Sequence, residues 1–336
     1  MNLEKIKEIL ISEPPYRKKQ IYKLLFSELI EDWQKATTLP LSLRKKLKFG
    51  VSFDIKAQPY FSKDKKTLKA LITLPDGAKI ETVLMQYDNR NSVCLSSQVG
   101  CPLGCRFCAT GKMGFRRNLT AGEIIDQVLY FARYLKKSGQ KIHSLVFMGM
   151  GEPFLNYDNV LEAIKIINNK DSFNIGIRHI SVSTSGIIEG INKLSQEALN
   201  INLAFSIHSA DNNLRSKLMP INRKYSLPDL LKSVENYLKA KNRKVMVEYV
   251  MLGGLNDSDK DAEDLANLLQ NNRHLYHVNL IQYNPTDTYT PSTKERAQAF
   301  LKVLKDCQIS TSERFRFGRD INASCGQLAV KNYEKR

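Results

Sequence analysis

Short apolar runs alternate with amphipathic segments from residue 92 to the C-terminus, and this alternation restricts the fold more than any other feature. In the segment 120–136, Thr120 and Glu123 have the spacing of a capping box, and the apolar residues that follow share one helix face. Repeated strand–helix units build parallel sheets covered by helices, so the pattern predicts an α/β fold, either a doubly wound sheet or a full or partial (β/α) barrel. The runs with the length and composition of buried strands are 93–97, 145–148, 180–183, 203–207, 245–251, 278–282 and 314–317.

Glycine or polar residues end several of these runs. Gly151 and Glu152 follow the second run, Ser183 ends the third, and Asn284 follows the sixth. In parallel α/β folds the carboxyl ends of the strands form the edge that carries binding and catalytic residues, so we expect the functional site there. Taken singly, Ser183 and Asn284 are equally compatible with ordinary turns, and a histidine such as His208 with a place in the core.

Two smaller regions precede this repeat. Residues 1–50 carry apolar residues at helical spacing, and Pro14-Pro15 separate a first helix from a second. Residues 51–91 contain two strand-like segments around Pro75-Asp76-Gly77, which is a hairpin signal. The sequence therefore predicts a helical domain at 1–50, a β-hairpin extension at 51–91 and the α/β domain at 92–336.

The chain is strongly basic, with 51 Lys and Arg against 34 Asp and Glu and a net charge of +17. Such a surplus favours a polyanionic partner such as nucleic acid, or else reflects a lysine-rich proteome. Many of the positive charges fall within residues 1–50, where they form either an RNA-docking surface or a solvated face. The sequence has no uninterrupted apolar run of ~18 residues and its first residues lack a secretory signal, so we expect a cytoplasmic location and no membrane partner.

Four of the six cysteines lie between residues 94 and 108, and three follow the spacing C-x3-C-x2-C. A large chain without a secretory signal does not favour a disulfide scaffold, so the cluster indicates metal or redox chemistry. Cys101, Cys105 and Cys108 suit a [4Fe-4S] cluster with one iron open to a small molecule. Alternatively, these three cysteines together with Cys94 could supply the four ligands of a zinc site.

Further motifs follow the cysteine loop in order along nearly the whole chain. They are 101–111 with 115–120, Phe-Met-Gly-Met-Gly-Glu-Pro at 147–153, 183–187, 218–222, 278–285 and 320–328. The cysteine spacing resembles that of radical S-adenosylmethionine (SAM) enzymes, and the full set resembles the RlmN/Cfr ribosomal RNA methyltransferases. This resemblance implies a partial (β/α) barrel of the radical SAM type, with a [4Fe-4S] cluster and SAM as cofactors.

The resemblance also implies the reaction, which is methylation of an aromatic carbon of adenosine with two SAM molecules. One SAM methylates a cysteine thiolate, and the second is cleaved at the open iron by an electron from the cluster. The radical so formed takes hydrogen from the methylated sulfur, and the resulting carbon radical adds to the base. The favoured target is C2 of an adenosine in 23S rRNA, with tRNA as a further candidate substrate.

Two alternatives remain open at this point. The first is Cfr-type methylation at C8 of the same adenosine, which confers antibiotic resistance. The second is a zinc-binding, RNA-binding protein without catalysis, which would account for the charge and the cysteine cluster.

By its motif positions, the resemblance assigns Cys325 as the methyl carrier, Cys94 as its transient disulfide partner and Glu81 as the proton acceptor. Ser324 stands where the family usually has alanine, a small change that leaves the role of Cys325 in place. Without the resemblance, Cys325 would be interpreted as a core thiol and Glu81 as the solvent face of a strand. The residues that the resemblance assigns to SAM are Gly151, Glu152, Ser183, Ser206, Ile207, His208 and Asn284.

The remaining expectations concern partners and one further thiol. The resemblance implies an electron donor such as a flavodoxin or a ferredoxin, and we expect a monomer. Cys307 matches no family role, and we expect it to be a core thiol at the end of a helix over 295–306.

Overall fold

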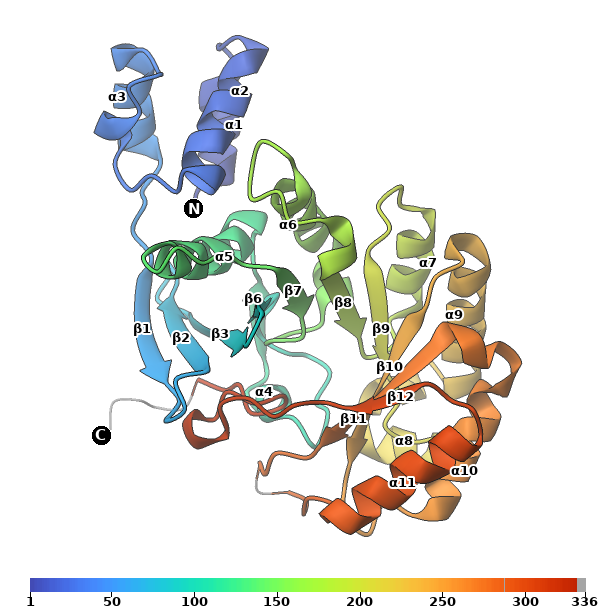
Figure 1. The fold of residues 1–336 in the computed structure, drawn as a ribbon. Helices are drawn as coiled ribbons and strands as arrows, with labels where there is room; N and C mark the ends of the chain where they lie inside the picture. Colours follow the sequence, from blue (N-terminus) through green and yellow to red (C-terminus); the bar gives the residue numbers. More distant parts are fainter. Residues whose placement is uncertain (287, 331–336) are drawn as a thin grey trace.

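The structure, a computed structural model, describes residues 1–286 and 288–330 (Figure 1). The α-helices are α1 (Leu3–Leu10), α2 (Pro15–Tyr22), α3 (Leu41–Gly50), α4 (Ala109–Lys112), α5 (Ala121–Lys136), α6 (Tyr157–Asn168), α7 (Ile188–Gln196), α8 (Asn212–Leu218), α9 (Leu227–Lys241), α10 (Asp259–Leu269) and α11 (Lys294–Asp306). The strands are β1 (Lys56–Phe61), β2 (Thr67–Thr73), β3 (Lys79–Tyr87), β4 (Arg90–Cys94), β5 (Gln98–Gly100), β6 (Phe115–Asn118), β7 (Ser144–Phe147), β8 (Ile180–Thr184), β9 (Asn202–Ser206), β10 (Val245–Met251), β11 (Tyr276–Gln282) and β12 (Thr311–Glu313).

Ten of the strands form one sheet in the order β1-β2-β3-β4-β7-β8-β9-β10-β11-β12. Strands β1 to β4 pair antiparallel, and every pair from β4 to β12 is parallel. Helices lie along the outer side of the parallel strands (Figure 1). The predicted α/β fold is confirmed, and no pairing joins β1 to β12 in the part of the chain that the structure describes, as a partial barrel requires.

The structure corrects three details of the predicted strands. The run 314–317 is not a strand, because β12 ends at Glu313 and the chain then leaves the sheet. Strand β4 begins at Arg90, earlier than predicted, and ends at Cys94. The hairpin of β2 and β3 is present, but β1 was missed, because its exposed edge position lets polar residues and Pro59 replace the apolar alternation.

Helix α5 anchors the parallel region as its sequence predicts. The Thr120 hydroxyl accepts a hydrogen bond from Glu123 N–H, and the Glu123 carboxylate accepts one from Thr120 N–H. Together these two bonds form the predicted capping box. Its predicted apolar face, which includes Ile124, Val128 and Phe131, is fully buried. One hydrophobic core includes residues from Leu3 to Leu328, so the same core joins both ends of the described chain.

The N-terminal helices pack on the outer surface of α5 and α6 (Figure 1). The Arg133 guanidinium on α5 donates to the carbonyls of Phe53 (3.1 Å) and Ile30 (3.0 Å). Lys7 on α1 forms an ion pair of 2.6 Å with Glu162 on α6. At the C-terminal end of the fold, Cys307 follows α11 as predicted, but it is only partly buried and packs against the core instead of lying within it. Among the described residues, no helix has the length and apolar character needed to cross a membrane.

We expect Thr120→Ala to lower the free energy of unfolding by about 1 kcal/mol, because it removes the oxygen that caps α5. Urea denaturation followed by circular dichroism measures this change. Thr37→Ala is the matched control, because Thr37 is exposed and caps no helix. An equal loss in both variants would contradict the capping role.

Candidate active site

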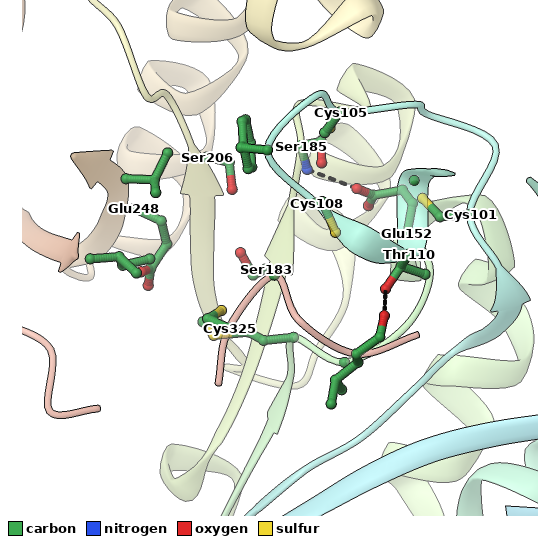
Figure 2. Close-up of a pocket in the computed structure, with 18 of the residues that line it drawn as sticks. Cys101, Cys105, Cys108, Thr110, Glu152, Ser183, Ser185, Ser206, Glu248 and Cys325 are labelled. Atoms are coloured by element: carbon green, nitrogen blue, oxygen red, sulfur yellow. Dashed lines mark hydrogen bonds between the residues drawn. The ribbon is translucent and has the colours of Figure 1, made fainter. Parts of the chain in front are cut away.

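The carboxyl ends of the parallel strands surround a cavity, here called the first cavity (Figure 2). The cysteine loop closes one side of it, and Ser183, Ser206, Glu248 and Cys325 lie on the other (Figure 2). Its lining residues come from the ends of β7, β8, β9, β10 and β11, from the cysteine loop and α4, and from the C-terminal segment. The site therefore lies at the strand edge that the sequence predicts.

Cys101, Cys105 and Cys108 all line the first cavity from the loop between β5 and α4. Burial raises the pKa of Cys101 to about 12, and burial with the neighbouring thiols raises that of Cys105. A backbone bond from Arg106 N to the Leu218 carbonyl (3.0 Å) ties the loop to α8. Within residues 1–286 and 288–330, no three His, Cys, Asp or Glu side chains are placed to hold a single metal ion.

Gly151 and Glu152 follow β7 at the wall of the first cavity. The backbone of Gly151 has a φ of +98°, and a Cβ there would lie 2.5 Å from Cβ of Gln98, so only glycine fits this position. The buried Glu152 carboxylate accepts bonds from the backbone N–H of Ser185 (2.7 Å) and of Phe154 (3.1 Å). Burial raises the pKa of Glu152, and these hydrogen bonds act in the opposite direction.

His208 lines the first cavity and is buried. Its Nδ1 accepts a bond from Val250 N–H (3.0 Å), and burial, aided by the charge of Arg215, lowers its pKa to about 3. The ring is therefore neutral with its proton on Nε2. Arg215 itself is buried and donates to the carbonyls of Ser185 (2.9 Å) and Ser206 (3.0 Å), which holds the ends of β8 and β9 together.

The other predicted SAM-binding residues are not all in this cavity. Ser183 and Ser206 line it, whereas Ile207 is fully buried beside it and lines no described cavity. Asn284 lines an adjoining cavity, here called the second cavity. Its Nδ2 donates to the carbonyl of Cys325 (3.2 Å), and its buried Oδ1 has no hydrogen-bond partner.

Cys325 lies where the two cavities meet, because it lines both of them. Its residue is exposed, while Cys94, at the end of β4, lines the second cavity only. The structure therefore brings these two thiols to one cavity and separates Cys94 from the three thiols of the loop. This arrangement does not match a zinc site made of all four cysteines.

The segment that carries Cys325 is fixed just after the cysteine by two hydrogen bonds. Ala109 N, next to Cys108 in the cysteine loop, donates to the Gly326 carbonyl (2.7 Å). Thr110 Oγ1 donates to the Leu328 carbonyl (2.6 Å), a bond drawn in Figure 2. The cysteine loop and the segment of Cys325 are therefore directly connected, although more than 200 residues separate them in sequence.

Glu81 is fully buried on β3 and lies outside the linings of both cavities. Its carboxylate forms an ion pair with the buried Lys69 (2.9 Å) and accepts a bond from Ala329 N (2.8 Å). Lys69 also donates to the Asn322 carbonyl (3.3 Å). The ion pair thus holds the C-terminal segment at points before and after Cys325.

Sequence reasoning missed Arg314, whose guanidinium lines both cavities together with Cys325. The guanidinium donates hydrogen bonds to the Glu248 carboxylate (3.4 Å) and to the sulfur of Met148 (3.0 Å). Burial of the Cys325 thiol raises its pKa, and the positive charge of Arg314 acts in the opposite direction. Arg314 was missed because residues 314–317 were predicted to form a strand. The sequence pattern of a strand does not show that one of its side chains contacts residues from distant segments.

Comparisons with known proteins agree with this geometry. The family model described as "Radical SAM superfamily" matches residues 95–269. A "Probable dual-specificity RNA methyltransferase RlmN" of Dictyoglomus thermophilum is 43% identical over 331 residues, which cover 97% of this chain and 94% of the relative. The protein of the same name from Chloroflexus aurantiacus is 43% identical, with 98% of this chain and 92% of the relative covered. The crystal structure of a radical SAM methyltransferase from Sphaerobacter thermophilus matches with a TM-score of 0.93 and 39% identity over 98% of both chains.

We expect acid to destabilise the folded protein through His208. Below pH ~6.5 the unfolded chain binds a proton on this histidine, whereas the folded ring, with its pKa of about 3, does not. Between pH 7.0 and 5.5 the wild type should lose about 1 kcal/mol more of its free energy of unfolding than His208→Gln, measured by urea denaturation. His274→Gln, at an exposed site, should keep the wild-type pH dependence. Identical pH dependence in the wild type and His208→Gln would contradict this role.

We also expect Arg314→Met to slow alkylation of Cys325 by iodoacetamide at least about threefold, because the rate follows the thiolate fraction. Cys325 is the one cysteine between Arg316 and Lys331, so tryptic peptide mass spectrometry follows it alone. Arg314→Lys keeps the charge and should retain most of the rate. Arg319→Met, which removes an exposed arginine of the same segment, is the control. An unchanged rate in Arg314→Met would contradict the electrostatic role.

Proposed function

The chain belongs to the radical SAM superfamily and, within it, to the RlmN family, and from this membership we propose that it methylates C2 of an adenosine in 23S rRNA, with tRNA as a second substrate. The observation that carries this proposal is the position of Cys325. This residue, which is exposed, stands between a cavity lined by the three-cysteine loop and a second cavity that is also lined by Cys94. A methyl carrier needs access to a methyl donor and to an acceptor, and a thiol between two cavities can reach one of them in each cavity.

The residues of the first cavity fit the two cofactors of this superfamily, a [4Fe-4S] cluster and SAM. Three thiols on one short loop are the soft ligands that iron–sulfur clusters require. The polar residues His208, Ser183 and Ser206 also line the cavity. In the adjoining second cavity, the buried Oδ1 of Asn284 has no hydrogen-bond partner, and a ligand would supply the missing donor. When bound, the cluster and SAM supply the methyl group and the electron that starts the radical chemistry.

We assign the chain's own residues as follows. Cys101, Cys105 and Cys108 hold the cluster, and Gly151 and Glu152 bind SAM together with Ser183, Ser206, Ile207, His208 and Asn284. Gly151 offers close backbone approach, and Ile207 acts through its backbone, since its side chain is buried. The SAM-binding role of Asn284 requires that SAM extend to the boundary between the two cavities.

The thiolate of Cys325 accepts the methyl group as a nucleophile, and its sulfur holds the carbon while it is transferred to the base. The Cys94 thiolate then attacks the sulfur of Cys325 and forms a disulfide, while the bond between that sulfur and the transferred carbon breaks. The electron pair of the broken bond stays with the carbon, which takes up a proton to become the methyl group of the released RNA. Glu81 accepts the proton that the target carbon loses. Because Glu81 is buried and bonded to Ala329, this step requires the C-terminal segment to move away from β3.

We further propose a division of labour along the chain. The basic helical region 1–50 binds RNA phosphates, residues 51–91 extend the sheet and supply Glu81, and 92–336 carries the other residues of the reaction. An electron donor such as a flavodoxin or a ferredoxin reduces the cluster. The enzyme acts as a monomer in the cytoplasm, where its thiols are kept reduced between turnovers.

The proposal predicts that protein purified without oxygen contains iron and sulfide and methylates 23S rRNA fragments when given SAM and a reductant. Nucleoside mass spectrometry should detect 2-methyladenosine, and Cys325→Ala should abolish it. Cys307→Ala is the matched control and should retain activity, because Cys307 lines neither cavity.

Several outcomes would contradict the proposal. 8-Methyladenosine as the product would establish the Cfr-type reaction instead. Zinc without iron, together with RNA binding but no methylation, would favour the non-catalytic alternative. Full methyl transfer by Cys325→Ala would exclude the carrier role.

A further inference from the structure

The second cavity has a composition that the cofactors do not explain. Its lining includes the apolar side chains of Val83, Met85, Val146 and Ile281, and the two thiols Cys94 and Cys325 open into it. The three cysteines of the cluster loop are absent from this lining. Under the proposed function, the carrier Cys325 must face an acceptor on the side away from the cluster loop, and the second cavity is on that side.

Phe315 marks this cavity from the solvent side. It lines the cavity, yet 65% of its surface is exposed. Single exposed apolar residues are common on protein surfaces, so exposure alone indicates nothing. What distinguishes Phe315 is its place in the wall of a cavity that also holds the methyl carrier.

The ring of Phe315 is the outermost member of an aromatic row. Its centroid lies 4.7 Å from that of Phe317, which in turn lies 4.6 Å from that of Tyr87. The Arg90 guanidinium covers Tyr87 at 4.3 Å from the ring centroid. Phe317 is buried and packs against the ring of Phe315, whereas most of the surface of Phe315 is exposed and can contact a ligand.

Cationic side chains accompany this row. Arg314 and Arg316 line the second cavity, and Arg316 donates to Oε1 of Gln282 in the same wall. Proteins recognise unpaired RNA bases by stacking them on aromatic rings beside positive charge. An apolar cavity, an exposed ring and two guanidinium groups around a nucleophilic thiol match a base attached to a phosphate backbone.

We infer that the second cavity receives the target purine of the RNA after it leaves its stack, and that Phe315 stacks on that base at the cavity mouth. This inference rests on the proposed function for the identity of the RNA. It adds a binding subsite and a residue that contacts the substrate base.

A binding cycle tests the contact without relying on turnover. Fluorescence anisotropy compares two RNA stem–loops, one with a single adenosine in a pyrimidine loop and one with an abasic nucleotide in its place. The wild-type holoenzyme should bind the adenosine RNA roughly 5- to 150-fold more tightly, the range that one base–aromatic stack provides. Phe315→Ala should lose most of this preference while binding the abasic RNA as the wild type does.

Two further variants separate stacking from structure. Phe315→Trp should restore the preference, because indole also stacks on bases. Phe61→Ala is the matched control, since Phe61 is half exposed but lies outside both cavities, and it should keep the wild-type preference. Alkylation of Cys325 should proceed at the wild-type rate in Phe315→Ala, which shows that the carrier segment is undisturbed.

The outcomes are distinct from those that test the proposed function. If Phe315→Ala keeps the preference for the adenosine RNA, or weakens both RNAs equally, the inference is wrong even when the enzyme methylates RNA. If the wild type shows no preference for adenosine over the abasic loop, the subsite is likewise excluded. If the preference depends on Phe315 but no methylation is detected, the subsite stands and the proposed reaction fails.

Discussion

Parallel pairing from β4 to β12 is the constraint on which the site depends. Because parallel strands all end at the same edge, residues distributed over more than 130 positions of sequence converge on one cavity. Arg215 reinforces this edge by donating hydrogen bonds to the carbonyls of Ser185, which follows β8, and of Ser206, which ends β9. The cysteine loop then needs to reach only this one edge to place its three thiols beside Glu152, Ser183 and His208.

Local signals in the sequence predicted the parts of the fold that local physics determines. Strand β10 has the predicted bounds, because its place between two paired strands gives it an apolar run that is interrupted only by Glu248, which lines the first cavity. The capping box of α5 formed as its spacing indicates. Strand β1 could not be found in this way, since an exposed edge strand needs no apolar alternation, and its pairing with β2 decides its conformation.

Only those residues of the candidate site that belong to a recognisable sequence motif could be predicted. The three cysteines and Cys325 have recognisable motifs, and the structure brings them to one cavity. Arg314 and Lys69 have no such motif, because their importance comes from partners far away in sequence: Glu248 for Arg314, and Glu81 with Asn322 for Lys69. Glu81 was placed by resemblance, and the structure adds that its carboxylate also holds the C-terminal segment.

The buried pair of Lys69 and Glu81 is not explained by stability alone. Replacing a buried ion pair with apolar residues of similar volume is often neutral or stabilising, because both charges lose their hydration on burial. The pair does more than neutralise itself, however, since Glu81 accepts from Ala329 N and Lys69 donates to the Asn322 carbonyl. Two apolar residues would pack on β2 and β3 but would leave these backbone groups unpaired. The ion pair is therefore best understood as the attachment of a segment whose thiol must stay between two cavities, and whose release would expose the carboxylate at the same time.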